Sequence, residues 1–119
     1  MARTKKVKLI ADLEKSEKYQ KLRDSLVNQV SDSNGNIQEY YLDMIDNYMS
    51  LWTTSKALQE DIRTRGVTVK WDNGGGQKGV KKNDSIAELN KTILQMTKLL
   101  ESLGLKPSDL VSGSDGDEL

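Results

Sequence analysis

One long helical pattern constrains the fold of this chain more than any other feature. Apolar side chains recur at three- and four-residue steps across residues 36–65. They are Tyr41, Met44, Ile45, Tyr48, Leu51, Trp52, Leu58 and Ile62. Asn36 and Glu39 form a predicted N-terminal cap, and Gly66 is predicted to end the helix. Such a helix is roughly 45 Å long, whereas a compact domain of this chain length is about 35 Å across. We therefore expect an elongated molecule.

A first amphipathic segment precedes the long helix, over roughly residues 16–30. Its apolar residues also follow helical spacing. They are Tyr19, Leu22, Leu26, Val27 and Val30. Leu9, Ile10 and Leu13 either extend this helix or form a short turn before it. An Asn-Gly turn at Asn34 and Gly35 then separates the first helix from the second.

A third amphipathic segment begins where Ser85 and Glu88 form a predicted capping box, with possible help from Asn83 and Asp84. Its apolar residues alternate at steps of three and four, as in the seam of a coiled coil. They are Ile86, Leu89, Ile93, Met96, Leu100 and Leu103. Gly104 is predicted to end this helix. We expect the second and third helices to pack together as a long helical hairpin.

Between these two helices, the sequence has the alternating pattern of a half-buried strand. Val67, Val69 and Trp71 alternate with polar residues, a glycine-rich turn follows, and Val80 lies in a possible return strand. The predicted fold class is mainly α, with a short glycine-rich β-hairpin at 67–82 between helices two and three. We divide the chain into a basic N-terminal arm (1–15), a helical oligomerisation domain (16–107) and an acidic, disordered tail (108–119).

The composition argues against an enzyme. The chain of 119 residues has no histidine and no cysteine. It therefore lacks the commonest general base and metal ligand, Ser-His or Cys-His nucleophile pairs, and any disulfide. We predict no catalytic residue, no metal site and no cofactor. No apolar run is long enough to span a bilayer, and the N-terminus does not resemble a signal peptide, so the expected location is the cytoplasm.

The glycine-rich stretch resembles a phosphate-binding loop only in part. Gly74 and Gly79 have the glycine spacing of a Walker A motif, but Val80 and Lys81 stand where lysine and a hydroxyl residue are required. The dinucleotide-binding fingerprint is also excluded, because the flanking chain has no βαβ pattern. Three interpretations stay open for this loop: a plain hairpin tip, a contact between subunits, or a site where lysines bind a polyanion.

The apolar surface of the chain exceeds what one helical hairpin would bury. Ala87 and Leu94 lie well away from the main seam of the third helix. This second surface predicts homo-oligomerisation. The candidate interface residues are Tyr41, Tyr48, Trp52, Trp71, Ala87 and Leu94. For the aromatic residues, an ordinary intramolecular core is the alternative.

Three segments together resemble a known family. They are "YLDMIDNYMSLW" from Tyr41, "DIRTRGVTVKWDNGGGQKGVKKND" from Asp61, and "SIAELNKTILQMTKLLESLGLKPSD" from Ser85. Their order is similar to that of the small subunit of tailed-phage terminases: a helix, an "RGV" turn, a glycine-lysine hairpin, "KKN", a helix and "LGL-x-P". The resemblance covers Tyr41 to Asp109. Many members carry proline after the "KKN" asparagine, where this chain has Asp84.

The resemblance implies a non-catalytic, ring-type homo-oligomer that recognises double-stranded viral DNA in the host cell cytoplasm. It also implies delivery of that DNA to the large terminase subunit, which carries the ATPase and nuclease. The candidate DNA-binding residues are Arg3, Lys5, Lys6, Lys8, Lys70, Lys78, Lys81 and Lys82. They would contact mainly phosphate. The alternative function is a helical homo-oligomeric scaffold that contacts only proteins.

Overall fold

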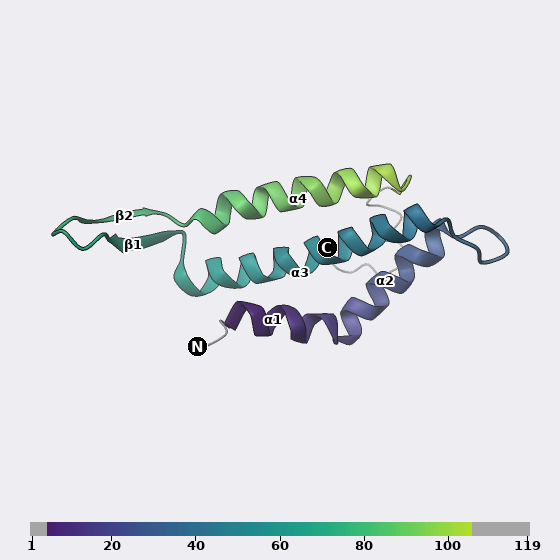
Figure 1. Cartoon of the computed structure of the whole chain (residues 1–119), viewed down its shortest axis with the longest axis horizontal. Helices are drawn as coiled ribbons and strands as arrows, with labels where there is room; N and C mark the ends of the chain where they lie inside the picture. The colour runs from purple at the N-terminus through teal and green to yellow at the C-terminus, as the bar shows by residue number, and fades with distance from the viewer. Residues whose placement is uncertain (1–4, 106–119) are drawn as a thin grey trace.

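The computed structural model describes residues 5–105 as a mainly helical chain with one small antiparallel sheet. In chain order the elements are α1 (Lys5–Glu14), α2 (Glu17–Val30), α3 (Glu39–Arg65), β1 (Thr68–Asp72), β2 (Lys78–Lys82) and α4 (Asp84–Ser102). Helix α3 lies between α4 on one side and α1 and α2 on the other, and the β-hairpin projects from one end (Figure 1). The molecule extends over 65 × 29 × 28 Å, which confirms the elongated shape expected from the length of α3.

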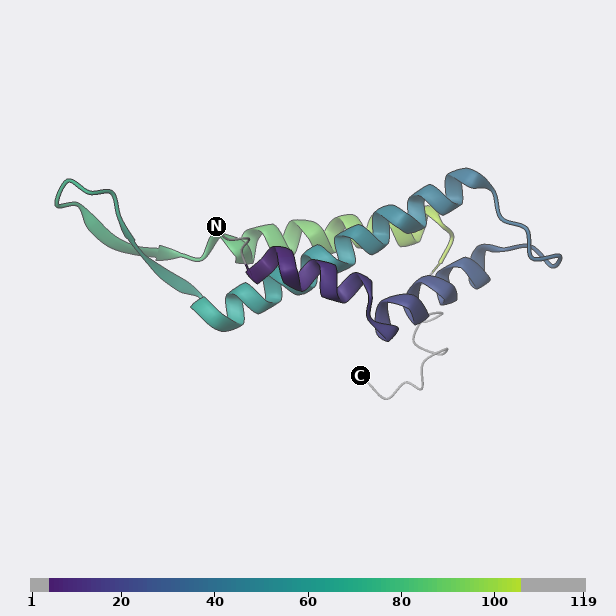
Figure 2. The ribbon, with the colours of Figure 1, turned by 60° about the horizontal axis from the view of Figure 1, so that its bottom comes forward.

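Helices α1 and α2 are separate, which resolves the choice that the sequence left open. Ser16 breaks the path between them: its Oγ donates to the carbonyl of Leu13 (2.7 Å), and the same oxygen accepts from the backbone N–H of Tyr19 (3.1 Å). One side chain thus satisfies an end of each helix. In both views α1 lies beside the C-terminal half of α3, so its N-terminal end faces the hairpin end of the molecule (Figure 2).

The start of α3 differs from the prediction. The expected cap, Asn36, lies in the α2–α3 loop, where its backbone N–H donates to Asp32 Oδ1 (2.9 Å) and its carbonyl accepts from the Asp32 N–H (2.8 Å). These bonds hold Asn36 in a turn around Gly35, and the helix begins three residues later, with Gln38 as N-cap. The predicted end at Gly66 is confirmed. Gly66 has a φ of +90°, and its N–H donates to the Ile62 carbonyl (2.8 Å).

The cap of α4 also differs from the prediction. Asn83 is the N-cap, and its side-chain oxygen accepts from the N–H of Ser85 (2.9 Å). Ser85 does not form the predicted capping box, because its hydroxyl donates to Asp61 on α3 (2.7 Å). The C-terminal end agrees with the sequence: Gly104 has a φ of +80°, and the Leu105 N–H returns to the Leu100 carbonyl (2.9 Å).

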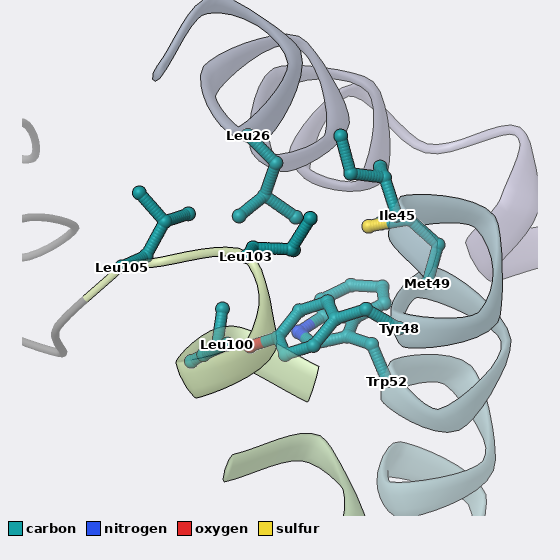
Figure 3. Close-up of a cluster of buried hydrophobic side chains, with 8 residues drawn as sticks. All are labelled: Leu26, Ile45, Tyr48, Met49, Trp52, Leu100, Leu103 and Leu105. Carbon is teal, nitrogen blue, oxygen red and sulfur yellow. The ribbon is translucent and has the colours of Figure 1, made fainter. Parts of the chain in front are cut away.

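The hydrophobic core lies at the end of the molecule opposite the hairpin. Its buried members come from α2, the N-terminal half of α3, the end of α4 and the turn that follows α4 (Figure 3). They are Leu26, Ile45, Tyr48, Met49, Trp52, Leu100, Leu103 and Leu105. Tyr19 packs edge-on against Trp52, with ring centroids 6.0 Å apart, and Arg23 on α2 pairs with Asp46 on α3 at 3.0 Å. The C-terminal part of the coiled-coil-like seam, with Met96, Leu100 and Leu103, therefore packs inside one chain.

The strand pattern is confirmed, but of the three residues predicted to be half-buried, only Val69 is. Strands β1 and β2 pair in antiparallel register, from Thr68 with Lys82 to Asp72 with Lys78. Val67, Trp71 and Val80 are all exposed. The hairpin projects beyond the helices (Figure 1), so neither of its faces packs on the body of the molecule. Apart from Val69, the apolar side chains of this segment face solvent in the single chain.

Replacement of Leu26 tests the core. Leu26 is fully buried where α2 packs against the helical hairpin, so Leu26→Ala should lower the free energy of unfolding by about 2–5 kcal/mol. Chemical denaturation followed by circular dichroism measures this decrease. Val67→Ala is the matched control, because Val67 is 62% exposed, and we expect a change within about 0.5 kcal/mol. Equal effects of the two substitutions would contradict the assigned core.

Candidate nucleic-acid interface

The register of the β-hairpin divides its side chains between two faces. Residues directly opposite one another in an antiparallel pair share a face, and successive pairs alternate. One face therefore carries the pairs Thr68–Lys82, Lys70–Val80 and Asp72–Lys78, and the other carries Val69–Lys81 and Trp71–Gly79. The four lysines that the sequence grouped together do not all point the same way. We call the first face the lysine face and the second the tryptophan face.

The lysine face carries three of the four predicted hairpin lysines. Lys82, Lys70 and Lys78 come from the three pairs of this face and alternate between the two strands. Each lysine is therefore diagonal to the next, with Cα atoms about 7–8 Å apart. All three belong to a part of the hairpin that projects into solvent (Figure 1). Asp72 is the one carboxylate in the paired residues of this face, so its formal charge is positive. This arrangement is a row of cations along the hairpin, suited to an extended anionic ligand.

Two shallow hollows lie along the hairpin, and residues of both faces line them. A hollow of about 430 Å³ lies toward the tip and is lined by residues 70–72 and 78–80. A second, of about 490 Å³, lies at the base and is lined by Arg65, Thr68, Val69, Lys70 and Val80. Lys70 and Val80 border both. The two hollows thus adjoin at Lys70 and Val80, with Lys78 toward the tip and Arg65 at the base.

The tryptophan face is mainly apolar. The Trp71 ring covers Gly79, where an added Cβ would come within 2.7 Å of the indole Nε1. A residue without a side chain is therefore needed opposite Trp71 if the ring is to keep this position. Lys81, the fourth hairpin lysine, lies on this face, and its Nζ pairs with Asp84 Oδ2 at 3.3 Å. Lys81 is thus set apart from the other three lysines by both orientation and pairing.

The glycine-rich tip does not have the geometry of a phosphate-binding loop. It joins two antiparallel strands, whereas a Walker A loop leads from a strand into a helix. The turn is held by its own polar groups. The Gly74 N–H donates to Asp72 Oδ1 (2.8 Å), and Asn73 Nδ2 donates to Gln77 Oε1 (2.7 Å).

A polar cluster that we call the Asp61 cluster fixes the base of the hairpin. It consists of Asp61, Arg65, Asn83 and Ser85, and Asp61 is only 5% exposed. Arg65 Nε and Nη2 each donate to the Asp61 carboxylate at 2.8 Å. Asn83 Nδ2 donates to Asp61 Oδ2 (3.2 Å) and to the Gly66 carbonyl (2.9 Å). The cluster therefore joins α3, the hairpin and α4. The hydrogen bond between Arg65 and Asp61 raises the pKa of the Arg65 guanidinium.

Sequence reasoning missed this cluster. The spacing of Asp61 and Arg65, four residues apart on one helix, is a recognisable pairing signal. The partnership with Asn83 and Ser85 is not, because these residues lie 22 and 24 positions from Asp61. Their "NDS" segment is typical of a helix cap, and this local function hid their interaction with α3.

The predicted basic arm is partly visible. Arg3 lies outside the described residues. Lys5, Lys6 and Lys8 belong to α1, and Lys8 is exposed. Because α1 begins at the hairpin end of the molecule (Figure 2), the structure brings two of the predicted basic segments to the same end. The acidic tail predicted at 108–119 lies outside the described residues.

The six predicted interface residues occupy different environments. Tyr48 and Trp52 are each 7% exposed and pack in the core of the chain, so their apolar surface is already used. Tyr41 is half-buried beside Tyr40, with ring centroids 4.7 Å apart. Of the other three, Trp71 and Leu94 are exposed, and Ala87 is exposed at the start of α4. The sequence reasoning missed Ile93, which is 45% exposed next to Leu94. Its place in the coiled-coil-like seam had suggested burial.

Other kinds of site are not found in the described part of the chain. No group of three or more carboxylate, histidine or cysteine side chains there is suited to a metal ion. None of the helices in residues 5–105 is both long and apolar enough to cross a membrane. The described part of the chain is a helical body whose main surface feature is a projecting basic hairpin.

Comparison with known proteins identifies the family. The family model described as "Phage terminase, small subunit" matches residues 20–111. This range includes the three segments that carried the resemblance and also most of α2. No curated protein and no solved structure matches the chain. The chain belongs to the family of phage terminase small subunits, which are non-catalytic, and it is accordingly not an enzyme.

Gly79→Ala tests the packing of Trp71 on the hairpin. The new methyl group would overlap the indole ring, so Trp71 should move while the helical body stays folded. We expect the Trp71 indole N–H resonance to shift in a two-dimensional NMR spectrum and that of the buried Trp52 to stay in place. Gly75→Ala is the control, since no atom lies within 4 Å of its Cβ position. An unshifted Trp71 resonance in the Gly79 variant would contradict this packing.

Proposed function

We propose that this protein is the DNA-recognition adaptor of a phage packaging machine. It binds double-stranded viral DNA, assembles as a ring-type homo-oligomer, and delivers the DNA to the large terminase subunit in the host cell cytoplasm. The single observation that carries the DNA-binding part is the lysine face, where Lys70, Lys78 and Lys82 line one side of a hairpin that projects away from the helices. Family membership supports the same function.

The lysine face favours phosphate contacts over base recognition. Lysine is a point charge on a flexible stem, and the face offers no aromatic ring, because Trp71 lies on the opposite side. Sequence preference would then arise from the shape of the DNA or from several subunits acting together. Lys8, with Lys5 and Lys6 on α1, is proposed to add to this interaction from the same end of the molecule. Arg3 is proposed as a further DNA contact.

Ring formation is proposed to use the apolar surface that the single chain leaves exposed. On α4 this surface comprises Ala87, Leu94 and Ile93, and on the hairpin it includes Trp71. An interface between different patches on neighbouring copies closes into a ring when the rotation between subunits permits it. Tyr41, which is half-buried on α3, is also proposed as an interface residue, whereas Tyr48 and Trp52 pack in the core of the protomer.

The second candidate function is a helical homo-oligomeric scaffold that contacts only proteins. It is favoured by the tryptophan face and by the exposed residues of α4, which suit protein partners better than DNA. Under this hypothesis the basic arm and the acidic tail are docking segments for protein partners. The two functions differ in one measurable respect, because only the first requires salt-dependent affinity for DNA.

Neutralising the lysine face should remove most of the affinity for duplex DNA. With Lys70, Lys78 and Lys82 changed to Gln, the slope of log affinity against log salt should become shallower by about 0.9 for each phosphate that is no longer neutralised. Fluorescence anisotropy of a labelled duplex at several salt concentrations measures this. Lys81→Gln is the matched control, because Lys81 points to the other face and pairs with Asp84, and its affinity should stay close to that of the wild type. Similar decreases in both variants would contradict the division of the hairpin into two faces.

Charge on the exposed face of α4 should disrupt assembly. Leu94 is 54% exposed in the single chain, so Leu94→Glu leaves the protomer folded but places a carboxylate in the proposed interface. We expect a smaller particle by multi-angle light scattering. Gln95→Glu, on the neighbouring exposed position, is the control for added charge. A Leu94 variant with the mass of the wild-type assembly would remove this surface from the interface.

A further inference from the structure

An arginine, Arg65, lies at the base of the lysine face, and the proposed function does not yet use it. Arg65 is the last residue of α3, and its side chain is 48% exposed although it is bound to a buried carboxylate. It lines the basal hollow together with Thr68 and Lys70. Those two residues belong to the lysine face. Arg65 therefore extends the row of lysines from the hairpin down to the helical body.

The guanidinium of Arg65 is held in a fixed orientation. Its Nε and Nη2 donate to the two oxygens of Asp61, and Nη2 also donates to Asn83 Oδ1 at 3.2 Å. These partners are themselves fixed, since Asp61 is 5% exposed and Asn83 is fully buried. A side chain that is already ordered gives up less conformational entropy on binding than a free lysine does.

The same hydrogen bonds leave part of the guanidinium unused. An arginine side chain has five N–H donors, and those of Nε and Nη2 are directed to the Asp61 cluster. The two N–H groups of Nη1 make no hydrogen bond to the described residues. Since Arg65 borders the hollow, these Nη1 donors are the ones available to a ligand there.

We propose that Arg65 is a phosphate-binding residue, and that it anchors one backbone phosphate of duplex DNA at the base of the lysine face. The proposal rests on the DNA-binding function proposed above and adds a residue and an orientation to it. The phosphate would occupy the basal hollow, between the Nη1 donors of Arg65, the Thr68 hydroxyl and the Lys70 ammonium. The buried carboxylate of Asp61 positions the guanidinium and does not touch the ligand.

A phosphodiester fits this site better than a protein carboxylate does. The site continues into a row of three further cations along the hairpin, and a row of this kind matches a ligand with regularly repeated charge. Two carboxylates, Asp61 and Asp72, stand against these four cations, and a third, Asp84, which also acts on Arg65, is paired with Lys81. Arginine also offers planar, directed donors to phosphate oxygens, whereas lysine offers a mobile charge. Arg65 would thus fix the position of the duplex along the hairpin.

Arg63 provides a matched control within the same helical turn. It is also paired with a carboxylate: Nε donates to Glu60 Oε1 at 3.0 Å, and Nη2 bonds to Glu60 Oε2. Its side chain is more exposed than that of Arg65, at 73% against 48%, but it lines neither hollow of the hairpin. If any arginine charge on this turn supports DNA binding, substitution of either residue should lower the affinity. If the position in the hollow matters, only substitution of Arg65 should.

The first test measures the affinity of the full chain for a labelled duplex as a function of salt. Arg65→Gln should weaken binding about tenfold, as expected for removal of a hydrogen bond to a charged group, and make the salt slope shallower by about 0.9. Arg65→Lys should keep the slope but bind less tightly than the wild type. Arg63→Gln should match the wild type. Wild-type affinity and slope in Arg65→Gln would overturn the proposal, as would an equal decrease in Arg63→Gln.

The second test needs no substitution and therefore does not depend on how a variant folds. Phenylglyoxal modifies accessible arginines, and mass spectrometry of the digested chain locates the adducts. Added duplex should protect Arg65 and leave Arg63 reactive. Equal reactivity of Arg65 with and without DNA would overturn the proposal. If the wild type shows no salt-dependent DNA binding at all, the proposed function itself fails. If the lysine variants bind DNA weakly and Arg65 stays unprotected, only the present inference fails.

Discussion

The buried carboxylate of Asp61 is the interaction on which the geometry of this molecule depends. It accepts hydrogen bonds from Arg65 on its own helix, from Asn83 at the start of α4, and from the Ser85 hydroxyl in the first turn of α4. A buried charge is costly unless it is fully paired, so these groups must be present together. The core lies at the far end of α3, and near the hairpin the Asp61 cluster is what joins the two long helices.

This cluster also explains how an exposed hairpin keeps a defined direction. Two short strands alone are only marginally stable in water, and neither face of this hairpin packs on the described helices. Its two ends, however, are tied at the base. The Asn83 side chain bonds to the Gly66 carbonyl, and the Asn83 N–H donates to the Val67 carbonyl at 2.8 Å. The orientation of the lysine face is thereby linked to the helical body rather than to packing along the strands.

Much of the fold could be predicted from the sequence, because it depends on local periodicity. The spacing of apolar residues predicted α3 and α4, and the alternation around Val69 predicted β1. The errors at Asn36 and Ser85 have one cause. Each residue has the right side chain for a cap but is committed to another partner, Asn36 to Asp32 in its loop and Ser85 to Asp61. Capping signals show which residues can begin a helix, but a competing partner decides which one does.

The candidate site was less predictable, because it depends on strand register and on long-range interactions. The sequence identified the hairpin lysines but not their division, which requires the pairing of Lys70 with Val80 and of Val69 with Lys81. A change of register by one residue would have reversed the two faces. Periodicity also could not separate a core position from an interface position at Trp52, since both environments require the same apolar stripe. Arg65 was missed because its position in the site depends on the path of the chain after the end of α3.

The neutral net charge of the chain is compatible with binding to a polyanion because the charges are separated in space. Lys70, Lys78 and Lys82 share one face at one end of a molecule 65 Å long, and screening confines their field to about 10 Å at moderate salt. A DNA duplex at that end would therefore respond to the local row of cations and little to the acidic residues elsewhere. Cyclic symmetry would repeat this face identically around an axis. Weak binding by one hairpin could then become strong binding by the assembly, because the linked sites bind the same duplex.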